Sequence, residues 1–134
     1  MPRSLPAALL ATLALAGCGA QQTDAGVDRF RGEERKVAQV VEDLSTAAEA
    51  KDSAEICGRL LAKQVVDRIA AGAQDCEQEI ETSLDDADGY DLTVQRVAVA
   101  GPDAATALVR DAEDKTRTLA FVRQGAGWRL ATFG

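Results

Sequence analysis

The stretch YDLTVQRVAVAGPDAATALVRDAEDKTRTLAFVRQGAGWRLATF, residues 90–133, decides the fold class of this chain. Apolar and polar residues alternate through most of it, and turn sequences at 101–103, 113–114 and 125–127 divide it into four runs. Alternation with a period of two predicts strands that bury one face. Because the connections are short, we expect an antiparallel meander. The expected strands are residues 92–99, 104–111, 115–123 and 128–133.

The first expected strand changes phase in its middle. Leu92 and Val94 alternate with polar residues, whereas Val97 and Val99 alternate one position later. One extra residue around positions 95–96 accounts for this change, because a β-bulge places two residues opposite one and bends the strand. The sequence therefore predicts a curved sheet.

Helical patterns occupy the residues before this stretch. Residues 33–50 carry apolar side chains at spacings of three and four, which form one stripe: Val37, Val40, Val41, Leu44, Ala47 and Ala48. Asp52 and Glu55 match a capping box that opens a second helical region, which we expect to break near residues 62–63 and to stop at Gly72. A last helix places Cys76, Ile80 and Leu84 on one side.

An antiparallel sheet usually keeps one face in solvent, so the helices are expected to cover the other face. The predicted class is therefore α+β, with N-terminal helices packed on a curved four-stranded antiparallel sheet.

Residues 1–17 have the pattern of a secretory signal. Arg3 supplies a positive charge, and residues 5–16 form an apolar run that is shorter than the roughly 20 residues a membrane span needs. Leu15-Ala16-Gly17-Cys18 resembles the lipobox of bacterial lipoproteins. The resemblance implies cleavage before Cys18, diacylglycerol on its sulfur and often a fatty acyl chain such as palmitate on the new amino group. It implies an extracytoplasmic protein that a lipid anchors to a cell membrane or envelope.

The remaining chain divides into two parts. Residues 18–29 are small and polar without periodicity, as expected of a lipidated cysteine followed by a flexible tether. Residues 30–134 are enough for a single domain and too few for two.

Two cysteines remain once Cys18 carries lipid. Cys57 and Cys76 lie on expected core-facing helix stripes, in a compartment that permits disulfides. We expect them to form a disulfide, the alternative being two buried free thiols on neighbouring helices. No metal site is expected, because the chain has no histidine and structural zinc needs four nitrogen or sulfur ligands.

Helices followed by a bulged meander that ends in Gly127-Trp128-Arg129-Leu130 resemble the nuclear transport factor 2-like superfamily, and in particular its small bacterial lipoprotein members. The helical cysteine pair and the segment TLAFVR, residues 118–123, also carry the resemblance, which covers about residues 30–134. It implies a cone-shaped α+β domain. Members include ketosteroid isomerases and polyketide cyclases as well as domains that only bind. This chain departs from many members in having no clear strand among its helices.

Composition favours binding over catalysis. The formal net charge is −7, so the surface repels phosphate backbones and nucleic acid is excluded as a partner. No histidine is present to act as a base, and the only tyrosine, Tyr90, lies in a turn-like segment. Strand geometry allows Asp111 to face the cone, although a surface position is the simpler interpretation. We expect no enzyme and no cofactor.

Three other patterns have two interpretations each. Asp85, Asp86 and Asp88 before Gly89 resemble the start of a calcium loop but lack its remaining ligands, which favours a solvated helix end. Arg110, Arg123 and Arg129 form an anion site if the sheet brings them together, and otherwise pair with nearby acids. Trp128 fills the core or lines a ligand pocket.

The expected function is a non-catalytic binding module for a small apolar ligand. Its cavity is expected to be lined by residues such as Val94, Leu108, Phe121 and Trp128. One alternative is an accessory protein whose sheet face or edge docks another envelope protein. Another is an isomerase-like or cyclase-like enzyme, which requires a buried acid.

Overall fold

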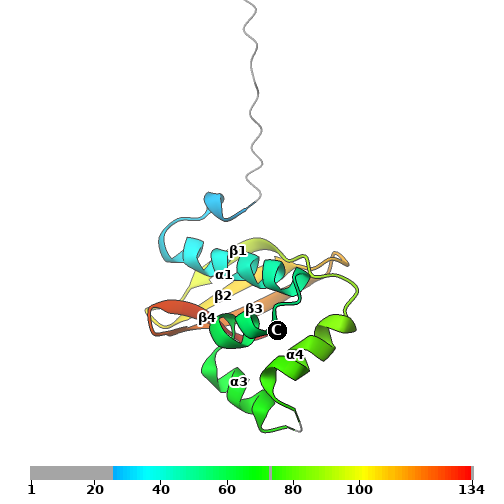
Figure 1. The fold of residues 1–134 in the computed structure, drawn as a ribbon. Coiled ribbons are helices and arrows are strands. Elements are labelled where there is room, and N and C mark those ends of the chain that lie inside the picture. The colour runs from blue at the N-terminus through cyan, green and yellow to red at the C-terminus, as the bar shows by residue number, and fades with distance from the viewer. Residues whose placement is uncertain (1–25, 73, 134) are drawn as a thin grey trace, which may run out of the picture.

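The computed structural model describes residues 26–72 and 74–133, so the lipobox, Cys18 and most of the tether lie outside the described residues. Helices come first and strands second (Figure 1). The helical elements are η1 (Val27–Arg29), α1 (Gly32–Glu49), α2 (Ser53–Glu55), η2 (Ile56–Leu60), α3 (Lys63–Ala70) and α4 (Cys76–Asp85). The strands are β1 (Thr93–Val99), β2 (Ala104–Arg110), β3 (Thr116–Gln124) and β4 (Gly127–Thr132). The predicted α+β class is confirmed.

Helix α1 supplies the largest share of the helical core. All six residues of its predicted stripe are buried, together with Ala38. The helix ends in a Schellman motif, in which Asp52 N donates to Ala47 O at 2.8 Å and Lys51 N donates to Ala48 O at 3.0 Å. Lys51 adopts the left-handed conformation at φ 54° that this motif requires. The turn redirects the chain into α2.

The second helical region is interrupted, as the sequence predicts. Asp52 caps it by accepting from Glu55 N at 3.0 Å, although the Glu55 carboxylate bonds Arg59 and does not return to the cap. The helix then continues as the π-helical turn η2. Ala62 is extended before α3 begins, which places the break where it was expected.

This break also lies against the sheet. Leu61 forms a parallel bridge with Leu130, and Ala62 N donates to Leu130 O at 2.8 Å. A two-residue extended segment between helices therefore covers part of the free edge of β4. The sequence showed no strand here because a single bridge leaves no alternating pattern.

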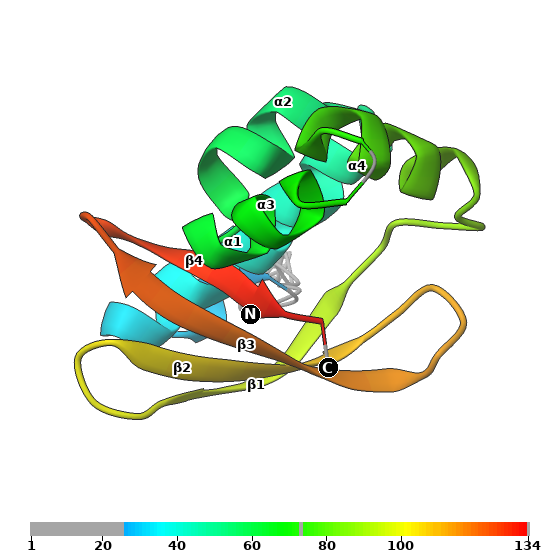
Figure 2. The same cartoon turned by 90° about the horizontal axis from the view of Figure 1, so that it is seen from below.

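The sheet is an antiparallel meander in the order β1-β2-β3-β4. Its register shifts between Val94 and Arg96, which confirms the predicted bulge in β1. A second shift lies between Ala120 and Phe121 of β3. Figure 2 shows the helices on one side of the twisted sheet and none on the other. One face is covered and one is open, as expected.

The two faces differ in composition. The covered face buries Val97, Ala105, Ala107, Val109, Leu119, Phe121 and Leu130. The outer face, defined here as the residues of β1, β2 and β3 that alternate with these, comprises Thr93, Arg96, Ala98, Ala104, Thr106, Leu108, Arg110, Thr116, Thr118, Ala120 and Val122. These residues are small, apolar or arginine, and none of those listed is acidic.

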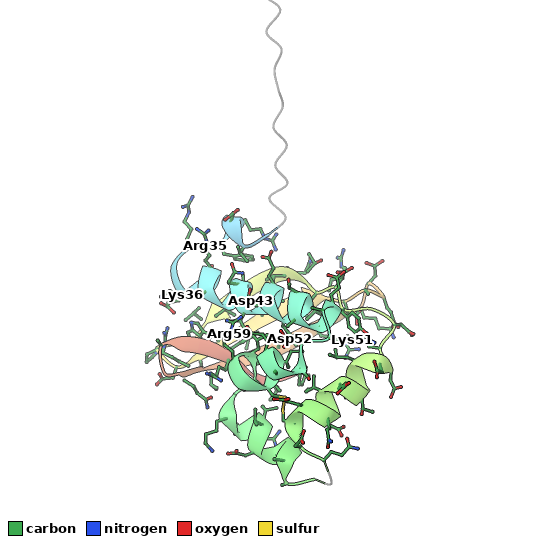
Figure 3. All side chains as sticks on the ribbon, viewed as in Figure 1. Arg35, Lys36, Asp43, Lys51, Asp52 and Arg59 are labelled. Atoms are coloured by element: carbon green, nitrogen blue, oxygen red, sulfur yellow. A yellow bond between two sulfur atoms is a disulfide. The ribbon has the colours of Figure 1, made fainter. Side chains whose placement is uncertain are left out.

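Cys57 and Cys76 form the predicted disulfide, which joins η2 to the first turn of α4 with a Cα–Cα distance of 6.1 Å. Figure 3 draws the bond in yellow between these elements. An ion pair at the other end of α4 adds to this connection, because Lys51, labelled in the same figure, lies 2.6 Å from Asp85. Both ends of α4 are thus held against the segment that follows α1.

A polar cluster around Glu33 joins α1 to β3 and β4. The Glu33 carboxylate accepts from Lys36 Nζ at 2.8 Å, from Trp128 Nε1 at 2.8 Å and from the Arg123 guanidinium, which lies 4.5 Å from the centre of the Trp128 ring. The hydrogen bonds from Lys36, Trp128 and Arg123 lower the pKa of Glu33 from 4.5 to about 2. The charged form of this carboxyl therefore stabilises the folded state.

We expect the Glu33→Gln variant to show a weaker acid dependence than the wild type. Because the folded-state pKa is depressed, the stabilisation is complete above the unfolded value of 4.5 and is lost as pH falls towards about 2. The difference in urea midpoint between the two proteins should be largest near neutral pH and shrink through that window. Glu34→Gln removes a neighbouring acid outside the cluster and serves as the control. A constant difference across the window contradicts the assignment.

Candidate ligand-binding pocket

A pocket of about 730 Å³ lies between the helices and the end of the sheet where β2 turns into β3. Leu44 and Ala48 of α1, Ile56, Ile69, Ile80, Leu84, Leu92 and Leu119 form its apolar floor. The sequence assigns most of these residues to core-facing stripes. Since known ligand pockets span roughly 300–1,000 Å³ and are mostly apolar, both size and lining suit a small molecule.

The segment between α4 and β1 forms one wall and is fixed by two hydrogen bonds. The Tyr90 hydroxyl donates to Leu84 O in the last turn of α4, a carbonyl that also accepts from Ala87 N at 3.3 Å. Leu92 N donates to Ser45 Oγ at 3.0 Å. These bonds tie the wall to both α4 and α1.

Asp111 lies at the pocket and organises the loop between β2 and β3. Its Oδ1 accepts from Glu113 N at 2.9 Å and Lys115 N at 3.0 Å, and its Oδ2 accepts from Arg117 Nε at 3.1 Å. The bond from the Lys115 backbone is the main cause that lowers the pKa of Asp111, and Arg117 adds to it. A catalytic base in an apolar site needs a raised pKa, so this carboxylate serves the loop.

The rim of the pocket is acidic. Glu79, Asp88, Asp91 and Glu113 are exposed residues on it. Glu113 lies 3.1 Å from Lys115, but within residues 26–72 and 74–133 no lysine or arginine lies within ion-pair distance of the other three. The mouth therefore carries uncompensated negative charge.

Comparison with known proteins finds no matching family model, no matching curated protein and no matching solved structure. The nuclear transport factor 2-like resemblance thus stays a prediction. Of the helices that the structure describes, none is long and apolar enough to cross a membrane.

The four residues expected to line a cavity do not line this pocket. Phe121 and Trp128 are buried in the core, which agrees with the interpretation of Trp128 as a core residue. The indole of Trp128 also donates a hydrogen bond to Glu33. Leu108 lies on the outer face, since its neighbours Ala107 and Val109 point towards the helices. Val94 lines a separate hollow beside η1. The α1 stripe covers the middle of the sheet, so the larger pocket lies at its end.

The three arginines considered as an anion site point in different directions. Arg123 faces the covered side and pairs with Glu33, whereas Arg110 lies on the outer face. Arg129 donates to Gly58 O at 3.1 Å and Leu61 O at 3.4 Å, which supplies partners to the carbonyls at the end of the π-helical turn. No shared site forms.

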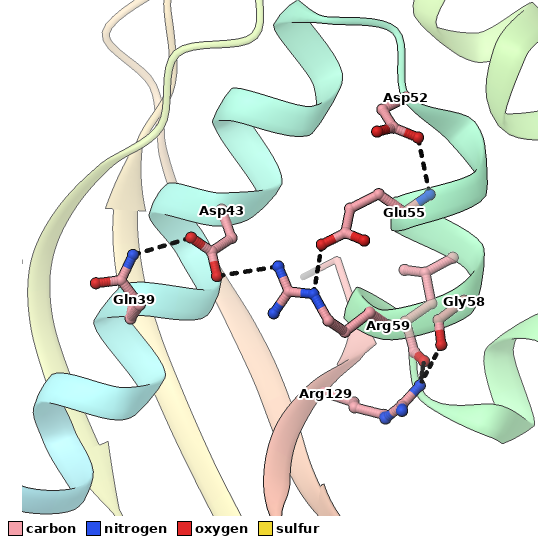
Figure 4. A network of polar contacts seen from close by, with 8 residues as sticks. Gln39, Asp43, Asp52, Glu55, Gly58, Arg59 and Arg129 are labelled. Carbon is pink, nitrogen blue, oxygen red and sulfur yellow. Dashed lines mark hydrogen bonds and ion pairs between the residues drawn. The ribbon is translucent and has the colours of Figure 1, made fainter.

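A further network fixes η2 to α1 (Figure 4). Arg59 donates to Glu55 and, at 3.2 Å, to Asp43, whose second oxygen accepts from Gln39 at 2.9 Å. The Glu55 bond is the main cause that raises the pKa of Arg59. Each member has a partner within the network, so this cluster is structural. Among the residues that the structure describes, no group of three potential metal ligands is placed to hold an ion.

Proposed function

We propose that this protein is a non-catalytic, lipid-anchored extracytoplasmic module that binds a small apolar ligand. The pocket carries the proposal. Its floor is apolar, its volume of about 730 Å³ suits a small molecule, and hydrogen bonds from Tyr90 and Leu92 hold one wall in place. A pre-formed site avoids much of the entropy cost of ordering a protein around its ligand.

The anchor and the cone-shaped fold belong to the same proposal. Lipid on Cys18 attaches the chain to a membrane, and the tether that follows it keeps the domain beside the membrane. The predicted tether of residues 18–29 is too long at its end, because Val27–Arg29 form η1 and Arg29 donates to Val94 O. Helices over one face of an open meander, with a pocket at one end, agree with a nuclear transport factor 2-like cone.

The chemistry around the pocket supports binding without catalysis. None of the polar or charged residues that the structure describes is buried. The Asp111 carboxylate is occupied by two backbone amides and Arg117, and the Tyr90 hydroxyl hydrogen is donated to Leu84 O. Neither an enclosed acid nor a free phenol is therefore offered to a substrate.

A second candidate function is docking to another envelope protein through the outer face. The observation that favours it is the composition of that face, in which Leu108 and Val122 lie among alanines and threonines with no acid. Protein interfaces are depleted in acids and enriched in arginine, and Arg96 and Arg110 fit this pattern.

The Ser83→Trp variant is expected to lose a ligand that the wild type carries. Ser83 is exposed on α4 and lines the pocket, so an indole there fills the entrance without entering the core. Native mass spectrometry of protein purified from its own envelope should show an added mass on the wild type that leaves on denaturation. Thr82→Trp places the same ring one residue away, outside the lining, and should retain that mass.

Two results contradict the binding function. One is a wild-type protein that carries no added mass, which shifts weight to the docking function. The other is equal ligand on the Ser83 and Thr82 variants, which places the ligand elsewhere.

The Cys18→Ser variant is expected to lose its lipid and to remain unprocessed at the lipobox. The substitution removes the sulfur to which the diacylglycerol is attached. Metabolic labelling with a fatty acid and the intact mass measure both effects. The double variant Cys57→Ser/Cys76→Ser is the control and should still incorporate label. Label on the Cys18 variant contradicts the proposed anchor.

A further inference from the structure

The charges around the pocket restrict which apolar ligand it accepts. Glu79, Asp88 and Asp91 lie on the rim, and among the residues that the structure describes no lysine or arginine is within ion-pair distance of them. Arg117 is the only basic residue among the described lining residues, and its Nε already bonds Asp111 at 3.1 Å. An incoming group therefore meets negative charge that the protein has not neutralised.

This charge disfavours anionic ligands. A fatty acid or a phosphorylated lipid would place its headgroup beside three carboxylates, on a chain of formal net charge −7. Like charges repel, and because the Debye length at physiological salt is about 8 Å, repulsion between groups closer than this is only partly screened. The same negative charge stabilises a bound cationic headgroup.

Two aromatic side chains at the pocket favour the same class of ligand. Tyr90 lines it with a ring whose hydroxyl is fixed to Leu84 O. Phe133 also lines it and is 49 % exposed, the only large hydrophobic side chain so exposed among the described residues. Aromatic faces attract ammonium groups, and an exposed phenylalanine at a pocket gains from an apolar occupant.

We propose that the ligand is a cationic amphiphile, with an apolar body of small-molecule size and a protonated amine. The body occupies the floor formed by Leu44, Ile80 and Leu119, and the amine stays at the rim beside Asp88 and Asp91. This inference rests on the proposed binding function and adds the chemical class of the ligand. The pocket volume favours a small molecule over a basic peptide.

The test compares three probes that each carry a phenyl ring and four methylene groups: phenylbutylamine, phenylbutanol and phenylpentanoate. The full processed chain is held in nanodiscs of phosphatidylcholine, and empty nanodiscs correct for partition into lipid. Ligand-observed NMR titrations give the dissociation constants. We expect the amine to bind most tightly, the alcohol less tightly and the carboxylate most weakly. Added salt should weaken only the amine.

A double variant, Asp88→Asn/Asp91→Asn, separates charge from shape. Exposed charge pairs each contribute little, so losing two should weaken binding of the amine about fivefold and leave binding of the alcohol unchanged. The control Glu77→Gln/Asp86→Asn removes the same charge from exposed residues outside the lining. It should change the affinity for the amine by less than about twofold, since screening weakens distant charges.

The outcomes distinguish this inference from the function on which it rests. An alcohol or carboxylate that binds as tightly as the amine overturns the cationic class and leaves the binding function standing. An equal loss of amine affinity in both double variants also overturns the cationic class, because the effect would then depend on the net charge of the protein and not on Asp88 and Asp91. If none of the probes binds, both proposals fail. Displacement of the amine by a basic amphipathic peptide at lower concentration than by any small amine assigns the site to a peptide instead.

Discussion

Truncation of Phe121 to alanine is expected to lower the free energy of unfolding by about 3–5 kcal/mol. Phe121 is 1 % exposed and lies opposite Ala105 on one side and Leu130 on the other, in the middle of the covered face. Its removal deletes a large apolar side chain and leaves a cavity that the flanking strands prevent from closing. The small size of Ala105 makes the loss larger, because no neighbouring side chain there is long enough to fill the space.

Urea unfolding followed by Trp128 fluorescence measures this loss. Phe133→Ala is the matched control, since the same atoms are removed from a residue that is 49 % exposed. It should cost less than about 1 kcal/mol of unfolding free energy, as surface substitutions usually do. Similar losses for the two variants would mean that Phe121 is not at the centre of the core.

Replacing both bridged cysteines by serine is expected to cost about 3 kcal/mol of unfolding free energy. Cys57 and Cys76 are 19 residues apart, and closing a loop of that length removes entropy from the unfolded chain. Cys76 is also buried, so serine there adds a desolvation cost. The expected loss is large because a domain of this size has a total stability of only about 5–15 kcal/mol.

Unfolding of wild type and Cys57→Ser/Cys76→Ser, each with and without reductant, measures the contribution of the disulfide. The wild type should lose stability in reductant, and the double variant should not respond. A wild type that is indifferent to reductant argues against the bond in solution, as does alkylation of both cysteines without reductant.

Most secondary structure follows from the sequence because its signals are local. The α1 stripe needs only the spacing of Val37, Val40 and Leu44, and the bulge in β1 needs only the phase change between Val94 and Val97. Asp52 was identifiable as a cap from its type and position. The disulfide required one further step, the assignment of Cys18 to lipid, which left two cysteines.

The pocket was not predictable in the same way. Its lining comes from α1, η2, α3, α4, the segment before β1, the loop after β2, strand β3 and the chain end, and no short pattern relates these segments. Alternation assigned Leu108 to a cavity because it identifies apolar residues without showing which face they occupy. The hydrogen bond from Trp128 to Glu33 was also missed, because the two residues are 95 positions apart and no local pattern relates them. The one local signal for the pocket was the segment before β1, where Tyr90 and Leu92 are apolar residues near Asp88 and Asp91.

Both edges of the sheet are partly covered in ways that bear on self-association. Leu61 and Ala62 run along β4, and Arg29 donates to Val94 O on the free side of β1 beside its bulge. Free strand edges are templates for adding strands from other molecules. Proteins tethered to a membrane diffuse in two dimensions and meet their own copies far more often than in free solution. If the proposed lipid on Cys18 anchors this chain, we expect these covered edges to keep a crowded layer of it from joining edge to edge.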